Sequence, residues 1–173
     1  MTSNFSILLR CTLLVLFLLL NSCQLPEITY KQTSNKMEVS TNVESLGKYV
    51  NWPSPPIKVF WQTREITKPS LLPGPIDRSL IAVLTFDDRT LDKIIQKSVR
   101  SQQMNRPYIQ DQLVFDWFPA ELKKSLTPSE TPGFFRINQD GYEPDIFVKS
   151  PFLQGYFVRV GKTSDLFIYL HTQ

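Results

Sequence analysis

The feature that most constrains this chain is a short apolar segment near its N-terminus. The apolar run covers residues 11–20, and Arg10 separates it from the apolar residues before it. A helix needs about 20 consecutive apolar residues to cross a bilayer, so this run is too short to span a membrane. A positive charge, an apolar stretch and then small polar residues are the three parts of a secretory signal peptide. We therefore expect residues 1–22 to direct export and then to be removed.

The end of this segment carries a second signal. Residues 20–23 read Leu-Asn-Ser-Cys, and this pattern resembles the lipobox of bacterial lipoproteins, in which a Leu is followed two residues later by a small residue and then by a Cys. In that class the Cys thiol is diacylated, the leader is cut just before it, and the new amine is acylated. The resemblance, which covers residues 1–23, implies that Cys23 is the lipidated first residue of the mature chain. Several fatty acids, palmitate among them, would hold the protein on a membrane far more firmly than one.

Cysteine content and size set the limits for the mature chain. Of the two cysteines, Cys11 leaves with the leader and Cys23 is acylated, so we expect no disulfide even though an exported protein could form one. Removing residues 1–22 from the 173 residues leaves 151, enough for one domain with its own core. Removing Arg10 from the 19 basic residues leaves 18 against 16 acidic ones. This balance argues against a nucleic-acid partner.

A polar stretch separates the lipidation site from the rest of the chain. Residues 24–45 are rich in Ser, Thr, Asn, Gln and charges, with few and scattered apolar residues, which predicts a flexible tether. Residues 46–173 would then form a single globular domain. The residue after the lipidated Cys influences sorting in Gram-negative lipoproteins. There, Gln24 in place of an Asp implies the outer membrane, facing the periplasm, in preference to the inner membrane.

Hydrophobic patterns in residues 46–173 predict an α+β fold. We expect a two-layer sandwich with a mainly antiparallel sheet of four or five strands, about two helices and a C-terminal β-hairpin. The expected strands cover residues 57–64, 80–86 and 145–149 and the hairpin 155–171, and the expected helices follow Asp87 and Pro119.

The hairpin pattern predicts a register and a candidate binding patch. If residues 161–165 form the loop, Val160 faces Leu166 and Val158 faces Ile168, all on one face. The other face would carry the candidate binding patch, which consists of Phe157, Arg159, Phe167 and Tyr169. A face this apolar either binds a partner or is covered by helices, and we favour the cover.

Tests for a catalytic, nucleotide or metal site are negative, and we expect no cofactor. Residues 161–163 read Gly-Lys-Thr but lack the first glycine of a P-loop at the required spacing, and a strand follows them. Residues 136–147 lack two essential ligands of an EF-hand, which leaves only an irregular calcium site as an alternative. That site would use Asp140, Glu143 and Asp145. A single histidine, His171, is insufficient for a zinc site and badly placed for a catalytic triad.

Three functional hypotheses remain. The first is a lipid-anchored, non-enzymatic envelope protein whose small domain binds a protein or another envelope component as an accessory, structural or immunity-like factor. The second is a small hydrolase of cell-wall or glycan material, because a carboxylate pair needs neither His nor Cys. Its candidate acids are Asp87, Asp88, Asp116 and Glu121, of which the first two could equally cap a helix. The third is a carrier of an apolar ligand, which requires a cavity between sheet and helices.

Overall fold

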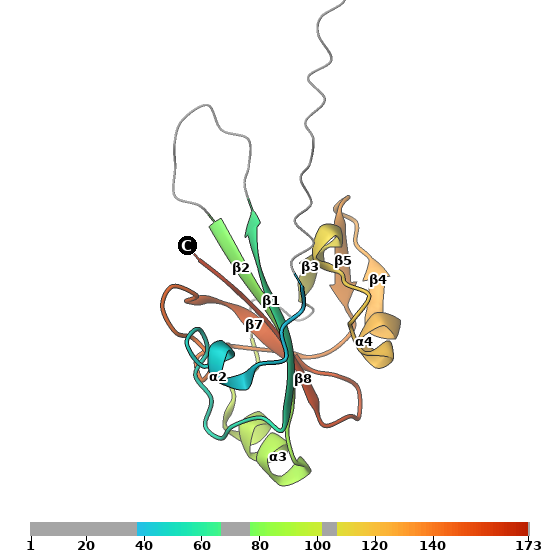
Figure 1. Cartoon of the computed structure of the whole chain (residues 1–173). Helices are drawn as coiled ribbons and strands as arrows, with labels where there is room; N and C mark the ends of the chain where they lie inside the picture. The colour runs from blue at the N-terminus through green and yellow to red at the C-terminus, as the bar shows by residue number, and fades with distance from the viewer. Residues whose placement is uncertain (1–37, 67–76, 102–106, 173) are drawn as a thin grey trace, which may run out of the picture. The chain divides into compact units, whose positions relative to one another are not determined.

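Two antiparallel sheets organise the part of the chain that the computed structural model describes, residues 38–66, 77–101 and 107–172 (Figure 1). The larger sheet has the order β1 (Lys58–Ile66), β2 (Asp77–Thr85), β8 (Asp165–His171), β7 (Gln154–Arg159), β6 (Gly141–Tyr142). The smaller has the order β3 (Tyr108–Gln110), β5 (Phe134–Ile137), β4 (Leu126–Pro128). The helices are α2 (Val43–Leu46), α3 (Asp88–Lys97), the 3-10 helix η1 (Asp111–Leu113) and α4 (Ala120–Ser125). The predicted α+β class with a C-terminal hairpin is confirmed.

Both faces of the larger sheet are covered. Figure 1 shows α2 and α3 on one side of β1 and β2, and the smaller sheet with α4 on the other. Leu46 of α2 and Leu91 of α3 belong to the buried cluster on the first face. Leu113, which ends η1, and Leu122 of α4 belong to the cluster on the second face. The smaller sheet is an addition that the sequence patterns did not reveal.

Residues 80–85 of the apolar run 80–86 lie in β2, an interior strand of the larger sheet that is covered on both faces, as predicted. Strand β2 pairs with β1 on one side and β8 on the other. Each residue from Leu80 to Leu84 is at most 3% exposed, because successive side chains point to opposite faces and both faces are covered. The chain then enters α3, whose N-cap is Asp87.

Asp87 caps α3 in the way the sequence predicted. Its carboxylate accepts a hydrogen bond from the Thr90 backbone N–H at 3.0 Å. Such a cap satisfies one of the unpaired N–H groups in the first turn, and its negative charge lies at the positive end of the helix dipole. Hydrogen bonding from the side chain and the backbone of Thr90 lowers the pKa of the Asp87 carboxyl.

Replacing Asp87 should change how stability depends on pH. A lowered pKa in the folded state means that the ionised cap contributes stability above the unfolded-state pKa and loses it as pH falls through the folded-state pKa. We expect Asp87→Ala to have a lower Tm than the wild type at pH 7 and a smaller deficit at pH 3. Asp87→Ser, which caps without titrating, should recover much of the Tm at pH 7. Thermal melts followed by circular dichroism at the two pH values measure this, and a deficit unchanged at pH 3 would contradict it.

The C-terminal hairpin is present, but the predicted register is wrong by one residue. Val158 pairs with Phe167, whereas the prediction placed Val158 opposite Ile168. The Val160 N–H donates to the Asp165 carbonyl at 2.9 Å, so the loop has one residue fewer than expected. A hydrophobic pattern fixes the register of two strands only where one face of the sheet is buried and the other is exposed to solvent. Here both faces are buried, so either register places apolar side chains in a core.

Two other segments differ from their predictions. Residues 145–149 do not form a strand: residues 145–147 are a turn, in which the Phe147 N–H donates to the Pro144 carbonyl at 2.7 Å. Residues 38–45, assigned from the sequence to the tether, belong to the folded unit. Ser40 exchanges two backbone hydrogen bonds with Trp61 of β1, at 2.8 and 2.9 Å. The domain therefore extends to the N-terminal side of residue 46.

Several predictions fall on other parts of the chain. The signal peptide of residues 1–22, the lipidation site Cys23 and the tether up to residue 37 lie outside the described residues. Within the described residues, none of the helices has the length and apolar character needed to cross a membrane.

Candidate functional site

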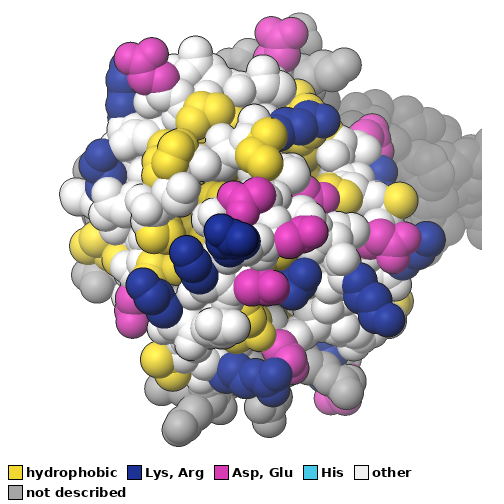
Figure 2. Space-filling view, turned by 90° about the horizontal axis from the view of Figure 1, so that it is seen from below, with side chains coloured by type: hydrophobic (Ala, Val, Ile, Leu, Met, Phe, Trp, Pro, Cys, Tyr) yellow, Lys and Arg dark blue, Asp and Glu magenta, His cyan; other side chains and the backbone are white. Residues whose placement is uncertain are grey.

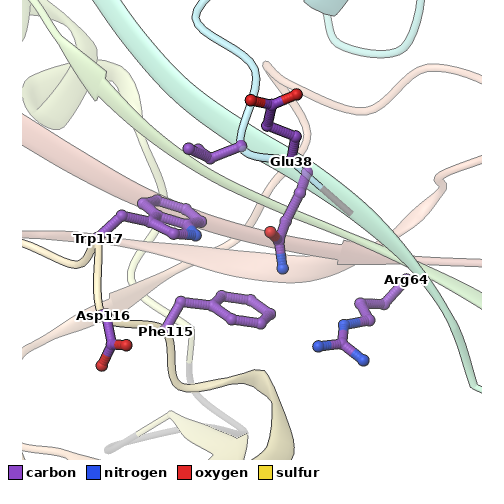
Figure 3. A pocket seen from close by; sticks show the side chains of 7 residues that line it. Glu38, Arg64, Phe115, Asp116 and Trp117 are labelled. Carbon is purple, nitrogen blue, oxygen red and sulfur yellow. The ribbon is translucent and has the colours of Figure 1, made fainter. Parts of the chain in front are cut away.

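The candidate site is a groove beside the edge strand β1 (Figure 3). It has a volume of about 530 Å³ and lies between β1, the residues that precede α2, and the segment that follows η1. Its lining residues are Glu38, Val39, Gln62, Arg64, Phe115, Asp116 and Trp117.

Alternation along β1 places its side chains on the two faces of the sheet. Val59 and Trp61 belong to the buried cluster beneath α2 and α3. The residues between and after them point to the opposite face, where Phe60 lies 6.4 Å from Trp117 between ring centroids and Arg64 enters the groove. The sequence pattern of β1 has Phe60 as an apolar exception on a polar side. Contact with Trp117 explains that exception.

Residues 115–118, here called the aromatic segment, form the opposite wall. The Phe115 and Trp117 rings are stacked with centroids 5.6 Å apart and an interplanar angle of 8°. Trp117 meets Phe118 edge to face at 4.9 Å, and Phe118 meets Phe167 of β8 edge to face at 5.3 Å. Offset and edge-to-face ring contacts are attractive beyond the area they bury. The partly buried rings of Phe115 and Trp117 are therefore held by contacts that continue through the buried Phe118 into the core.

Arg64 and the aromatic segment face each other across the groove. The Arg64 guanidinium carbon lies 5.4 Å from the centre of the Phe115 ring, a cation–π distance. Figure 3 shows the guanidinium directed from β1 toward Phe115 and Trp117. Gln62, another lining residue, is only 6% exposed. Arg64 forms no ion pair with any residue that the structure describes.

Two buried donors in this groove have no acceptor. Arg64 Nε and Trp117 Nε1 are both buried and without a hydrogen-bond partner in residues 38–66, 77–101 and 107–172. Such a donor costs about 1–3 kcal/mol relative to a satisfied one, so buried donors are nearly always paired in folded proteins. A third, Arg136 Nε, lies away from the groove lining, where the arginine stacks on Tyr108. Arg64 and Trp117 both belong to the lining of the groove, but these two nitrogen atoms are themselves shielded from solvent.

Carboxylates are confined to the rim of the groove. Glu38 and Asp116 are both exposed, and Figure 3 shows their carboxylates directed away from the space between Arg64 and the two rings. The Asp116 backbone carbonyl accepts a hydrogen bond from Lys123 Nζ at 2.6 Å. The interior of the groove consequently presents donors and aromatic surface, and the negative charge lies outside.

A second hollow lies beside α3. It has a volume of about 260 Å³, and Lys93 and Lys97 contribute to its wall. On the face seen in Figure 2, Lys and Arg side chains alternate with Asp and Glu side chains. Opposite charges this close cancel the field that would attract a charged ligand. We therefore place the candidate site in the groove beside β1.

The candidate patch predicted on the hairpin does not form one surface. Phe157 and Phe167 are both 0% exposed, and they lie on opposite faces of the sheet. Arg159 pairs with Asp92 at 3.3 Å, and Tyr169 is half-buried with its hydroxyl accepting from Ser79. The expectation that these residues are covered therefore describes them better than a binding patch does. On the face that carries Phe167, the smaller sheet and the aromatic segment contribute to the cover as well as α4.

The carboxylates considered for catalysis have separate structural roles. Asp87 caps α3, Asp88 accepts a hydrogen bond from the Ser164 hydroxyl, and Glu121 pairs with Lys124 at 2.7 Å. The described residues contain no group of three or more His, Cys, Asp or Glu side chains placed to hold a metal ion. In the irregular calcium site considered above, Asp140 pairs with Arg100 at 3.0 Å.

The remaining sequence candidates are structural as well. The Gly-Lys-Thr stretch at residues 161–163 lies in the β7–β8 hairpin loop, where the Thr163 hydroxyl donates to the Val160 carbonyl. His171 ends β8 with its ring 5.7 Å from Tyr169. Burial raises the pKa of both Tyr156 and Tyr169, so neither hydroxyl would exchange a proton near neutral pH.

Comparisons of the chain with models of protein families, with curated proteins and with solved structures found no match. The function is therefore inferred from the groove and from the N-terminal sequence signal.

Proposed function

We propose that this chain is a lipid-anchored protein of the bacterial cell envelope, on the outer membrane facing the periplasm. In this proposal the globular domain is not an enzyme. It binds another envelope component in the groove between β1 and the aromatic segment. The anchor is supported by the lipobox resemblance at residues 20–23, and the binding role is supported by the groove.

The observation that carries the binding role is the composition of the groove. Its volume falls within the range of about 300–1,000 Å³ typical of ligand sites, and such sites combine aromatic walls with a few placed polar groups. Tryptophan and arginine are the residues most often found to dominate binding energies at protein interfaces. Arg64 lies on the β1 wall of the groove and Trp117 on the wall that the aromatic segment forms.

The two alternatives have less support. A hydrolase needs two carboxylates across one cleft, and three of the four candidate acids already serve as a cap, a hydrogen-bond acceptor or an ion-pair partner. A carrier of a purely apolar ligand needs an apolar lining, whereas Glu38, Gln62, Arg64 and Asp116 are among the residues that line this groove.

Replacing Cys23 tests the anchor. Cells that express the wild-type chain should incorporate radiolabelled palmitate into it, and the protein should fractionate with membranes. Cys23→Ser removes the thiol that would be acylated, so label and membrane association should both be lost. Cys11→Ser, at the other cysteine of the chain, is the matched control and should keep both. Palmitate incorporation into Cys23→Ser would contradict the anchor.

Photo-crosslinking tests the groove. A benzophenone-bearing phenylalanine in place of Phe115 keeps an aromatic ring in the wall, and irradiation of the intact envelope should attach it to the bound component. The same residue in place of Tyr108, an exposed aromatic of β3 outside the groove lining, is the matched control. We expect a discrete crosslinked product at Phe115 and none at Tyr108. Equal products at both positions, or none at Phe115, would contradict the proposal.

A further inference from the structure

We infer that the partner is an extended polypeptide segment, which adds to the outer edge of β1 as a further strand and places one apolar side chain in the groove. The outer edge is the side of β1 that does not face β2. This inference rests on the proposed function, because it names the partner class and the binding mode of the same groove. It is carried by the backbone groups of β1 and by the position of the groove beside them.

The backbone groups of Thr63 and Glu65 are directed to the outer edge. Trp61 exchanges two backbone hydrogen bonds with Ser40 on that side. In an antiparallel sheet the backbone groups of alternate residues point to the same neighbour, so those of Thr63 and Glu65 point to the same side as those of Trp61. Strand β1 ends the sheet order, and no described residue forms a backbone hydrogen bond with Thr63 or Glu65 on this side. An extended chain carries N–H and C=O groups at the spacing that matches such a row.

The groove opens beside this part of β1. Its lining includes Gln62 and Arg64, the two residues that flank Thr63. In an added strand, the residue opposite Arg64 would direct its side chain to the same face as Arg64, which is the face of the groove. There it would meet Phe115, whose ring centre lies 5.4 Å from the Arg64 guanidinium carbon. One residue of the partner therefore reaches an aromatic wall, while its two neighbours form hydrogen bonds with the backbone of β1.

The chain's own N-terminal side does not supply this strand within the described residues. A continuation of the pairing made by Ser40 would place Glu38 opposite Thr63. These two residues share no backbone hydrogen bond, so the pairing stops at Ser40. The position opposite Thr63 is therefore open to another segment.

A second copy of the chain is disfavoured by charge. Pairing of two β1 strands through Thr63 and Glu65 of both copies would place Arg64 opposite Arg64 of the second copy. Pairing centred on Glu65 would place the two Glu65 side chains opposite each other. Like charges directly opposite each other destabilise a strand pair, and charged side chains commonly protect edge strands from self-association. The occupant is therefore a different polypeptide.

The carboxylates of the rim indicate the charge of the partner. Glu38 and Asp116 are exposed, and neither forms an ion pair with a described residue. In the added strand, the side chains two positions before and after the apolar one point to the same face. Basic side chains at these positions would be attracted by the rim. The partner segment is therefore apolar at one position and basic two positions to either side.

A synthetic peptide tests this binding mode. Its sequence, acetyl-TKVFVKT-amide, has the expected pattern and reads the same in both directions, so the direction of the added strand does not matter. Methylation of both valine N–H groups removes the donors that would face β1. Methylation of the phenylalanine and one lysine N–H, which would point away from β1, is the matched control. We expect the first methylated peptide to bind the full-length protein at least about tenfold more weakly than the second, as measured by isothermal titration calorimetry.

Amide hydrogen exchange locates the peptide on β1. At a peptide concentration of about ten times Kd, exchange of the Thr63 and Glu65 amides should slow by about tenfold, because a bound state protects in proportion to its occupancy. The Arg64 amide is the internal control. It points to β2, where Arg64 is paired with Ser79, so its exchange should change little.

Two variants of Thr63 test the backbone donor directly. Thr63→Pro removes an N–H that bonds to no described residue, and proline is tolerated where an edge strand faces outward. Peptide binding should weaken by at least about tenfold. Thr63→Val keeps the N–H and should bind like the wild type. Thermal melts check that both variants fold, and the methylated peptides test the same hydrogen bonds on the unaltered chain.

Absence of peptide binding, or equal binding of the two methylated peptides, would overturn strand addition. Slow exchange of the Thr63 and Glu65 amides without peptide would show that the edge is already occupied, by the N-terminal segment in a monomer or by a second copy in a dimer. Either result would also overturn the inference.

The crosslink at Phe115 separates this inference from the proposed function. A crosslinked product that carries a lipid or a glycan would overturn the polypeptide partner and leave the binding role standing. Binding of the peptide without any crosslinked product would support strand addition and overturn the role in the envelope.

Discussion

Replacing Phe157 or Phe167 with alanine is expected to lower the free energy of unfolding by about 3–5 kcal/mol in each case, the usual cost of emptying a buried phenylalanine site. Phe157 is completely buried, stacked on Tyr142 at 5.1 Å and edge to face with Phe147 at 5.0 Å. Phe167 is completely buried on the other face, against Phe118 at 5.3 Å. Each change removes a large apolar side chain from a different cluster, and urea denaturation followed by circular dichroism measures both.

Leu153 provides the control for these two variants. It precedes β7 and is 50% exposed, so Leu153→Ala should change the free energy of unfolding by no more than about 0.5 kcal/mol. Had the two phenylalanines formed an exposed patch, their alanine variants would resemble Leu153→Ala. A cost below about 1 kcal/mol for both phenylalanine variants would therefore contradict the covered sheet and the observed register.

Replacing Gly155 with alanine is expected to lower the free energy of unfolding by about 3 kcal/mol or more, because backbone strain and overpacking act together. Gly155 has a φ of 138°, which L-residues rarely adopt. A Cβ at this position would overlap the Tyr169 carbonyl oxygen and lie 2.9 Å from the Leu170 Cα, both on the backbone of the paired strand β8. The backbone of a central strand cannot move aside without breaking its own ladder. The urea midpoint of Gly155→Ala should fall well below that of the wild type.

Gly133→Ala is the control that separates backbone strain from steric overlap. Its φ of 80° is also positive, but a Cβ there would meet no atom within 4 Å. Gly133→Ala should consequently lower the free energy of unfolding by only about 1 kcal/mol, the cost of the backbone conformation alone. A deficit in Gly155→Ala no larger than that in Gly133→Ala would show that the close approach of β7 to β8 is not as described.

Local signals predicted the elements that depend on local chemistry. Residues 80–85 lie in a strand because an apolar run this short, bounded by polar residues, fits the interior of a sheet. Asp87 begins α3 because a capping carboxylate serves the first turn of any helix. The register of β7 against β8 was not predictable in this way. Phe157 and Phe167 are equally apolar, so the pattern alone does not say which of them faces which cluster.

The groove could not be predicted from the sequence because its walls meet only through tertiary packing. Arg64 and the aromatic segment are separated along the chain by β2, α3 and β3. One signal was present in the sequence, namely Phe60 on the otherwise polar side of β1. An aromatic residue on that side needs an apolar neighbour from elsewhere, and the Phe-Asp-Trp-Phe sequence at residues 115–118, which no predicted element included, supplies it.

The pairing of Ser40 with Trp61 has a mechanical consequence. Tension that reaches the domain from its N-terminal side would act first on the two backbone hydrogen bonds between these residues and on the indole hydrogen bond to Asn42. Glu38 and Val39 lie just outside this attachment and form part of the groove wall. A molecule held between Val39 and Arg64 would bridge the N-terminal segment and the edge strand, and would therefore resist peeling of one from the other. The force needed to separate the N-terminal segment from β1 would then increase as the groove is occupied.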